Sequence, residues 1–318
     1  AISALNGLYK NSSSPEFVRR IAWEALFKLA DEPTREQLQN EIAELLPAEI
    51  RNLAINGSAE SLNKALQKRL ENGKQNDFSI LESLYQIDNE NTRNVLLEIL
   101  KTAPFQRNYF QRIRHIFKMA EYRRDAEVFA IIVYRFDKEP PAEWRLYSAN
   151  TRQYLQRRIW RTLKQLGEEN EPDYIKMAVE ILLQYADFDA VSSQSINSKW
   201  DAYASYINFG HLLYENSPRY VLLLNTKAWR CRYNYQPGDP EPTDREEAFP
   251  QLWDAHPEAL LKLLLESNCR PVNHFGVKAL KANRKFWEEI EIKTLIKLLE
   301  RPYEITVEFA FENSDTQA

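Results

Sequence analysis

Glycine is scarce in this chain of 318 residues: only 7 are present, and none of the motifs GxGxxG, GxxxxGKS/T or GxSxG occurs. Loops that cradle phosphates, and sharp turns that expose a nucleophilic serine, depend on glycines at such spacings. The sequence therefore excludes nucleotide hydrolysis and dinucleotide-dependent redox chemistry as expected functions.

Cysteine and histidine are also sparse. Cys231 and Cys269 are the only cysteines and form no CxxC, and the four histidines stand far from one another and from both cysteines. This spacing gives no disulfide framework and no metal-binding motif. We expect no metal, no cofactor and a reducing, cytoplasmic location.

Long apolar runs are absent as well. No stretch of eighteen apolar residues occurs, and the first residues show no charged segment followed by an apolar one. Neither a membrane span nor secretion is expected. Because 44% of the residues are apolar and 12% are aromatic, the composition is that of a packed globular protein.

What the sequence contains is helical periodicity. In residues 17–32, FVRRIAWEALFKLADE, apolar side chains recur at i, i+4, i+8 and i+11 after Ser14-Pro15, which predicts an amphipathic helix. A second helix is predicted from Thr34 to Pro47. The same pattern predicts helices at about 58–71, 77–86, 91–102, 108–120, 124–136, 150–166, 173–186 and 199–214. Short polar connections between them indicate antiparallel neighbours.

Two internal matches indicate a repeat. Residues 17–32 align without gaps on 154–169 and share an arginine, a tryptophan, two leucines and a glutamate. Residues 270–283 and 301–314 both begin with Arg-Pro, at a spacing of 31. A drifting period of this size, with one helical hairpin per unit, resembles HEAT-type α-solenoids.

Four strings narrow this resemblance. They are AEVFAIIVYRF (126–136), YSANTRQYLQRRIWRTLKQLGEE (147–169), NFGHLLYENSPRY (208–220) and REEAFPQLWDAHPEALLKLLLESNCRPV (245–272). They resemble the HEAT-like helical repeat region of large uncharacterised bacterial proteins, in some of which it accompanies a WGR domain. The resemblance covers about 108–314 and implies a scaffold working near nucleic acid. No WGR-like segment is visible in this chain.

The helical rhythm is interrupted once. We expect N-terminal helical repeats over 1–186, an irregular insertion over 187–256 and C-terminal helical repeats over 257–318. The insertion joins a serine-rich stretch to an apolar run, alternating aromatics and a Pro-Gly-Asp-Pro cluster, which favours an extended arm or a hairpin. It either carries function or caps an apolar groove. The last repeat is truncated after one helix, so we expect the chain to belong to a longer polypeptide.

Positive charge is concentrated in one region. Residues 101–164 hold fifteen Lys or Arg and six acids, a net charge of +9, although the whole chain carries −4. On a helical wheel, basic residues of 150–166 lie opposite the leucines, with Trp160 at the boundary. The candidate polyanion- or partner-binding residues are Arg112, Arg114, Arg152, Arg157, Arg158, Arg161 and Lys164. A solvated, salt-bridged face and a contact for an acidic protein are the alternatives.

Other residues admit two interpretations. Aromatics interleaved with the basic residues suit base stacking, but their helical spacing favours the core, least clearly for Trp144 and Tyr147. Asp187 and Asp189 form a carboxylate pair suited to acid–base chemistry, and an N-cap for the next helix is the simpler role.

These patterns lead to two functional hypotheses. The first is a non-enzymatic scaffold that binds a protein partner or neighbouring domains of the same polypeptide. The alternative is a solenoid that binds DNA or RNA through the 101–164 basic region. Its enzymatic extreme resembles HEAT-like DNA glycosylases and would use Trp160, Arg157, Arg161 and Asp187 or Asp189. No catalytic motif supports an enzyme.

Overall fold

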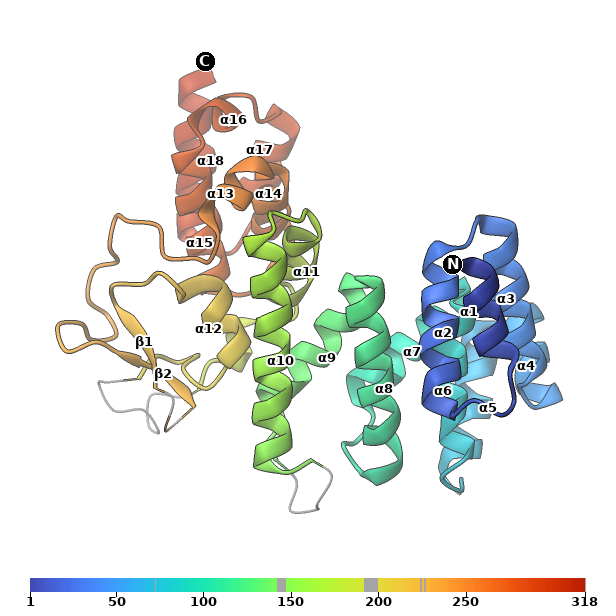
Figure 1. Ribbon diagram of the computed structural model, residues 1–318. Helices are drawn as coiled ribbons and strands as arrows, with labels where there is room; N and C mark the ends of the chain where they lie inside the picture. Colours follow the sequence, from blue (N-terminus) through green and yellow to red (C-terminus); the bar gives the residue numbers. More distant parts are fainter. Residues whose placement is uncertain (72, 142–146, 192–199, 224, 226, 318) are drawn as a thin grey trace. The chain divides into compact units, whose positions relative to one another are not determined.

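The computed structural model describes residues 1–71, 73–141, 147–191, 200–223, 225 and 227–317. These residues form eighteen α-helices, two short 3-10 helices and one two-stranded antiparallel sheet (Figure 1). The predicted all-α class is confirmed. None of the described helices combines the length and the apolar character that a membrane span requires.

The chain divides into two compact units. Unit 1 comprises the described residues of 1–128 and 142–147, and unit 2 those of 129–141 and 148–318. The boundaries expected at 187 and 257 both lie inside unit 2. The candidate binding residues are divided between the units, with Arg112 and Arg114 in unit 1 and the other five in unit 2.

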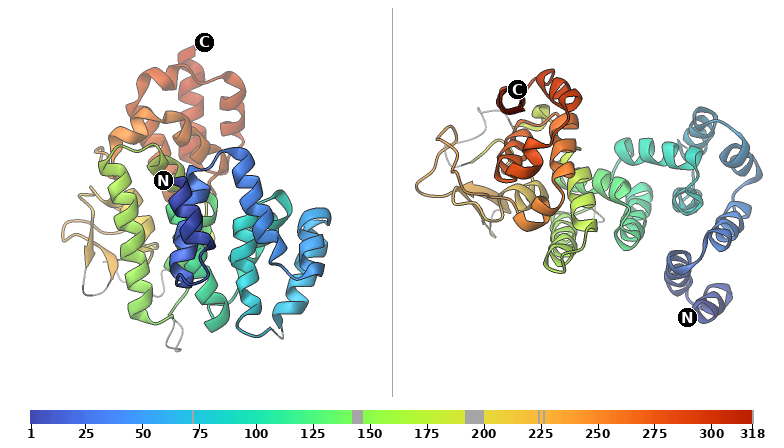
Figure 2. Two further views of the ribbon diagram at one scale, coloured as in Figure 1. Left: turned by 45° about the vertical axis from the view of Figure 1, so that its right-hand side comes forward. Right: turned by 90° about the horizontal axis from the view of Figure 1, so that it is seen from above.

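Unit 1 is built from helices that run alongside their neighbours, and the right-hand view of Figure 2 shows most of them nearly end-on. They are α1 (Ile2–Lys10), α2 (Glu16–Leu29), α3 (Glu32–Glu44), α4 (Ala48–Asn56), α5 (Ala59–Glu71), α6 (Ile80–Ile87), α7 (Glu90–Thr102) and α8 (Arg107–Arg123). Helices α1 and α4 were not predicted. Pro47, which the sequence predicts at the end of a helix, is the N-cap of α4.

Polar N-caps fix where the helices of unit 1 begin. Asp31, Ser58, Asn89 and Asp125 each accept a hydrogen bond from the backbone N–H three residues later. Such a cap satisfies one of the free N–H groups of the first turn. Because Asp31 is the cap, the helix expected from Thr34 begins earlier, at Glu32.

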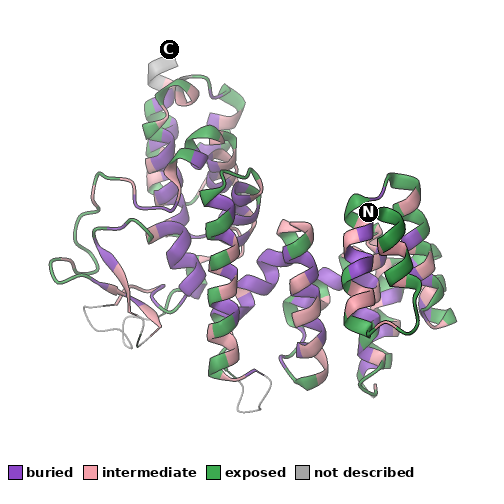
Figure 3. Ribbon diagram, in the orientation of Figure 1, coloured by how far each residue is buried: buried purple, intermediate pink, exposed green. Residues whose placement is uncertain are grey.

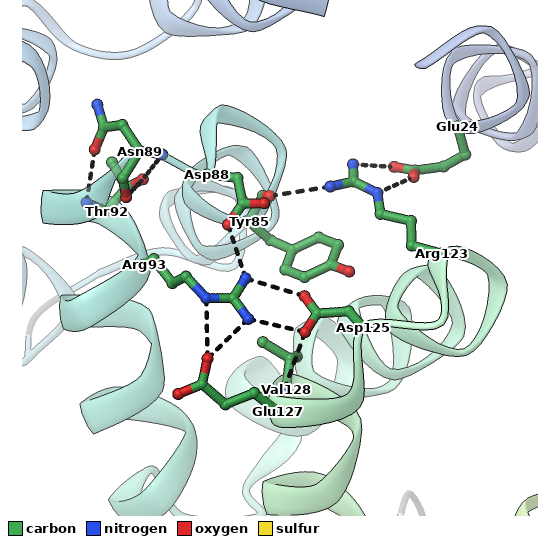
Figure 4. Close-up of polar contacts among 10 residues, drawn as sticks. All are labelled: Glu24, Tyr85, Asp88, Asn89, Thr92, Arg93, Arg123, Asp125, Glu127 and Val128. Atoms are coloured by element: carbon green, nitrogen blue, oxygen red, sulfur yellow. Dashed lines mark hydrogen bonds and ion pairs between the residues drawn. The ribbon is translucent and has the colours of Figure 1, made fainter. Parts of the chain in front are cut away.

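One arginine joins two successive turns of unit 1 (Figure 4). Arg93, in the first turn of α7, lies 3.0 Å from Asp88 in the α6–α7 turn. It also makes a two-pronged contact with Asp125 in the α8–α9 turn, at 2.9 and 3.1 Å, and lies 2.8 Å from Glu127. Paired guanidinium and carboxylate groups fix orientation as well as distance, so Arg93 sets the spacing of these turns.

Unit 2 contains the remaining α-helices and both strands. They are α9 (Ala126–Lys138), which begins in unit 1, α10 (Ala149–Glu168), α11 (Asp173–Leu182), α12 (Ile207–Tyr214), β1 (Tyr220–Leu223), β2 (Ala228–Cys231), α13 (Pro250–Ala255), α14 (Pro257–Glu266), α15 (Arg270–Ala282), α16 (Arg284–Glu288), α17 (Ile292–Leu299) and α18 (Glu304–Gln317). Figure 3 shows buried and exposed residues alternating along α10, as expected for an amphipathic helix.

The helix predicted over 199–214 was too long. It begins only at Ile207, and the described residues before it form turns. The reason is a distant cap: the Asp137 carboxylate accepts the N–H groups of Asn208 at 2.7 Å and Phe209 at 3.3 Å. This contact joins residues about seventy positions apart, which local periodicity does not reveal.

Strands β1 and β2 form a hairpin that packs on α12. The strands pair from Tyr220 with Cys231 to Leu223 with Ala228. Trp229 on β2 is buried, and its Nε1 donates to the carbonyl of Ile207 at 3.2 Å. A Cβ atom at Gly210 would lie 2.1 Å from Trp229 Nε1, so glycine is required at this point of α12.

Candidate anion-binding site

Arg112, on α8 of unit 1, is committed to a buried ion pair. Only 9% of the residue is exposed, and its Nη1 lies 2.7 Å from Oε1 of Glu82 on α6. His115 Nδ1 contacts the same oxygen at 2.8 Å, and Nη1 of Arg20 on α2 lies 3.7 Å from the other carboxylate oxygen, Oε2. Glu82 therefore joins three helices, and Arg112 does not face a ligand.

This cluster makes the stability of unit 1 dependent on pH. Burial raises the pKa of Glu82, but interactions with His115 and Arg112 outweigh it and hold the pKa below the ordinary 4.5. The ionised carboxylate stabilises the folded state fully at a pH above about 4.5, the ordinary pKa of a glutamate. This stabilisation is lost as the pH falls through the pKa that Glu82 has in the folded protein, which is lower. Urea unfolding of wild type and Glu82→Gln should show a stability difference that shrinks over this acid range.

The matched control for this experiment is Glu98→Gln on α7. Glu98 makes an exposed ion pair with Lys101, and 62% of its side chain is accessible. Its substitution should have little effect at any pH. A stability difference for Glu82→Gln that stays constant from neutral to acid pH would contradict the assignment.

Arg114, two residues further along α8, lines an open hollow. This α8 hollow has a volume of about 350 Å³ and is lined by Gln75, Arg107, Phe110, Gln111, Arg114, His115 and Lys118. Arg114 lies 5.8 Å from the centre of the Phe110 ring. No carboxylate belongs to this lining, so the α8 hollow is a basic site within unit 1.

Two of the arginines on α10 have structural roles. Arg152 donates from Nε to the carbonyl of Phe136 at 2.9 Å and from Nη2 to the carbonyl of Asp137. These are carbonyls at the end of α9, which lack partners within their own helix. Arg158 contacts the hydroxyl of Tyr154 at 3.4 Å. Neither arginine lines the second basic hollow, which lies beside α10.

This second basic hollow, the α10 hollow, is lined by the remaining three predicted residues, Arg157, Arg161 and Lys164. It has a volume of about 270 Å³ and is lined by Gln153, Gln156, Arg157, Trp160, Arg161, Lys164, Ile207, His211, Leu222 and Lys227. The cations come from α10 and from the residue that precedes β2. The apolar and aromatic side chains come from α10, α12 and β1.

The electrostatics of the α10 hollow are one-sided. Arg157 and Arg161 are exposed, and no carboxylate pairs with either among the described residues. Lys164 lies 3.7 Å from Glu168 in an exposed pair, which is a weak interaction in water. None of the residues lining the hollow is acidic. The hollow therefore presents four cations to solvent with little internal compensation.

The aromatic side of the hollow is rigidly held. Trp160 stacks on His211 with ring centroids 4.3 Å apart and planes inclined by 5°. His211 Nδ1 lies 2.7 Å from Glu215, and the Trp229 ring meets His211 edge-on at 5.3 Å. Packing and hydrogen bonding thus fix the ring that borders the cations.

The two aspartates considered for acid–base chemistry have structural contacts. Asp189 is buried and accepts hydrogen bonds from Tyr134, Lys138 and the backbone N–H of Ala186. Asp187 accepts the N–H of Arg270, in the first turn of α15, at 2.7 Å. Neither lines the α10 hollow. Asp187 caps the distant helix α15 rather than the next helix along the chain, α12, whose first N–H groups are accepted by Asp137.

The aromatic residues divide between core and site. Tyr147 is buried and packs against Phe105 and Phe110, at centroid distances of 4.7 and 4.9 Å. Trp144 lies outside the described residues. Six lining residues of the α10 hollow are not indicated by the sequence: Gln153, Gln156, Ile207, His211, Leu222 and Lys227. Among these, His211 stands in the sequence as an isolated histidine. For Lys227, the one indication in the sequence is its position just before the alternating residues that predict a strand.

Comparison of the chain with protein-family models, with curated proteins and with solved structures finds no match. The described residues contain no group of three or more His, Cys, Asp or Glu side chains placed to hold a metal ion. The features that bear on function are the two basic hollows.

Proposed function

We propose that this protein is a non-enzymatic nucleic-acid-binding protein whose phosphate contacts are made by the α10 hollow. The observation that carries the proposal is the set of Arg157, Arg161, Lys164 and Lys227 around one hollow without an acidic residue in its lining. Arg157 and Arg161 meet no carboxylate among the described residues, and Lys164 meets only the exposed Glu168. Such cations lose little when they exchange water for phosphate.

The spacing of the cations suits a nucleic-acid backbone. Arg157, Arg161 and Lys164 stand at i, i+4 and i+7 on one face of α10, a stripe about 10 Å long by helix rise. Guanidinium groups bind phosphate oxygens in a two-pronged geometry. A HEAT-like stacking of the helix pairs is part of this proposal, since stacked pairs create extended surfaces for large ligands. The resemblance to repeat regions that accompany WGR domains also supports a function near nucleic acid.

The proposal predicts strong, salt-dependent binding. Arg157→Glu, Arg161→Glu and Lys164→Glu together should abolish binding of labelled single-stranded DNA and RNA, measured by fluorescence anisotropy. For the wild type, log affinity should fall with log salt at a slope of about −2 to −3, as three or four phosphate contacts to a single strand require.

A control with the same change in net charge is available in unit 2. Lys176, Lys293 and Lys297 are exposed and lie on α11 and α17, outside the α10 hollow. Their combined substitution by Glu should lower affinity only modestly, through the general field of the protein. Equal losses in both triple variants, or no binding by the wild type at low salt, would contradict the proposal.

A second candidate function is protein binding by a scaffold, and α17 favours it. Ile292, Ile296 and Leu299 are exposed by 67%, 52% and 41%, and their spacing of i, i+4 and i+7 places them on one face of the helix. Such an apolar stripe suits a protein partner or a neighbouring domain of the same polypeptide. The anisotropy experiment separates the two functions, because a purely protein-binding scaffold binds neither DNA nor RNA at low salt.

A further inference from the structure

The α10 hollow has a part that phosphate binding does not use. Beside the four cations, its lining includes Trp160, Ile207 and Leu222, which form an apolar wall, and the amide of Gln153. Trp160 is only partly buried. Phosphates gain nothing from an apolar aromatic wall, so the ligand that fits the whole hollow carries a flat, apolar group as well as negative charge.

The wall is prepared for a ring before any ligand arrives. Trp160 is held parallel to His211, and His211 is held by Glu215 and by the edge of Trp229. Trp229 is itself fixed by its bond to the Ile207 carbonyl. A preorganised aromatic surface avoids the entropic cost of ordering side chains on binding.

We propose, as an extension of the nucleic-acid-binding function, that the α10 hollow takes one unpaired nucleobase against Trp160 while Arg157, Arg161, Lys164 and Lys227 hold the flanking phosphates. Stacking on an aromatic side chain is open to every base, because each has a π-face. Bases in a duplex are already stacked and paired, so they cannot reach the wall without being extruded. The hollow therefore selects single strands over duplexes.

The size and the polar edge of the hollow agree with one base. Its volume of about 270 Å³ lies just below the usual range of about 300–1,000 Å³ for small-ligand pockets, which suits a single base better than a base pair. The Gln153 amide has no hydrogen-bond partner among the described residues. It has both donors and an acceptor for a base edge.

The test separates the base from the phosphates. Anisotropy is measured for three labelled ligands of equal length: an oligodeoxythymidine strand, a strand with the same phosphates whose sites are all abasic, and a duplex. The wild type should bind the oligodeoxythymidine roughly 5- to 150-fold more tightly than the abasic strand, the range expected for one stacked base. The duplex should bind no better than the abasic strand.

Variants assign the difference to the wall. Trp160→Leu should abolish the preference for the oligodeoxythymidine over the abasic strand, whereas Trp160→Phe should retain most of it. If Trp160→Leu does not fold, Leu222→Ala on β1 provides the second variant and should reduce the same preference.

The possible outcomes distinguish base binding at Trp160 from phosphate binding by the α10 hollow. Equal affinity for the oligodeoxythymidine and abasic strands, with a steep salt dependence for both, overturns the inserted base and leaves the phosphate-binding proposal standing. Tighter binding of the duplex than of the single strand also overturns the inserted base. No binding of any of the three ligands at low salt overturns both.

Discussion

Replacing Asp137 with alanine is expected to destabilise unit 2 by at least about 3 kcal/mol, because several buried donors would lose their acceptor together. The Asp137 side chain is fully buried. Its two oxygens accept five hydrogen bonds: from the Gln156 amide at 2.9 Å, the Tyr185 hydroxyl at 3.0 Å, the Asn208 amide at 2.9 Å and the backbone N–H groups of Asn208 and Phe209. Alanine offers none of these acceptors.

Urea unfolding of the full chain gives the overall effect of this substitution, and hydrogen exchange locates it. The amides of Asn208 and Phe209 should exchange much faster in Asp137→Ala, because the cap of α12 is lost. Asp173→Ala, in the first turn of α11, is the control, and a change within about 0.5 kcal/mol is expected for this site. Unchanged protection of the two α12 amides would contradict the assigned role.

Asp137 also links stability to the candidate site. It holds the start of α12, and α12 carries Ile207 and His211, which line the α10 hollow. Gln156 lines the hollow as well and donates to the same carboxylate. Loosening this contact should therefore separate the two walls of the hollow and weaken ligand binding, even though Asp137 touches no ligand.

Features encoded locally were predictable from the sequence. The helix expected over 150–166 spans Ala149–Glu168. Its apolar arc is buried at Leu155, Ile159 and Leu163, and Arg157 and Arg161 are exposed as the helical wheel required. The period of 3.6 residues fixes which side of a helix faces the core, so single-helix information was enough to find three of the four cations of the α10 hollow.

Features that depend on distant partners were not predictable. Arg112 and Arg114 looked equivalent in the sequence, yet Arg112 is buried against Glu82, thirty residues earlier, and Arg114 lines the α8 hollow. Lys227 joins the α10 hollow only because the hairpin packs on α12. Charge in a sequence indicates where cations are, but only the fold decides which of them are neutralised.

Glu24 on α2 and Arg123 on α8 form a deeply buried ion pair in unit 1 (Figure 4). Arg123 Nε lies 2.7 Å and Nη2 3.1 Å from the two carboxylate oxygens, and the two side chains are exposed by only 9% and 7%. The guanidinium also lies 4.5 Å from the ring centroids of Phe27 and Tyr85. Because so little of the Arg123 side chain is exposed, solvent compensates poorly for a lost carboxylate.

Glu24→Gln should accordingly cost about 3–5 kcal/mol, the usual effect of leaving one charge of a buried pair uncompensated. The double variant Glu24→Leu with Arg123→Met removes both charges and should be less destabilised than Glu24→Gln, because no buried charge remains. Urea unfolding of the full chain measures both, with the exposed-pair variant Glu98→Gln as control. A double variant less stable than Glu24→Gln would show that the pair contributes net stability of its own, beyond neutralising Arg123.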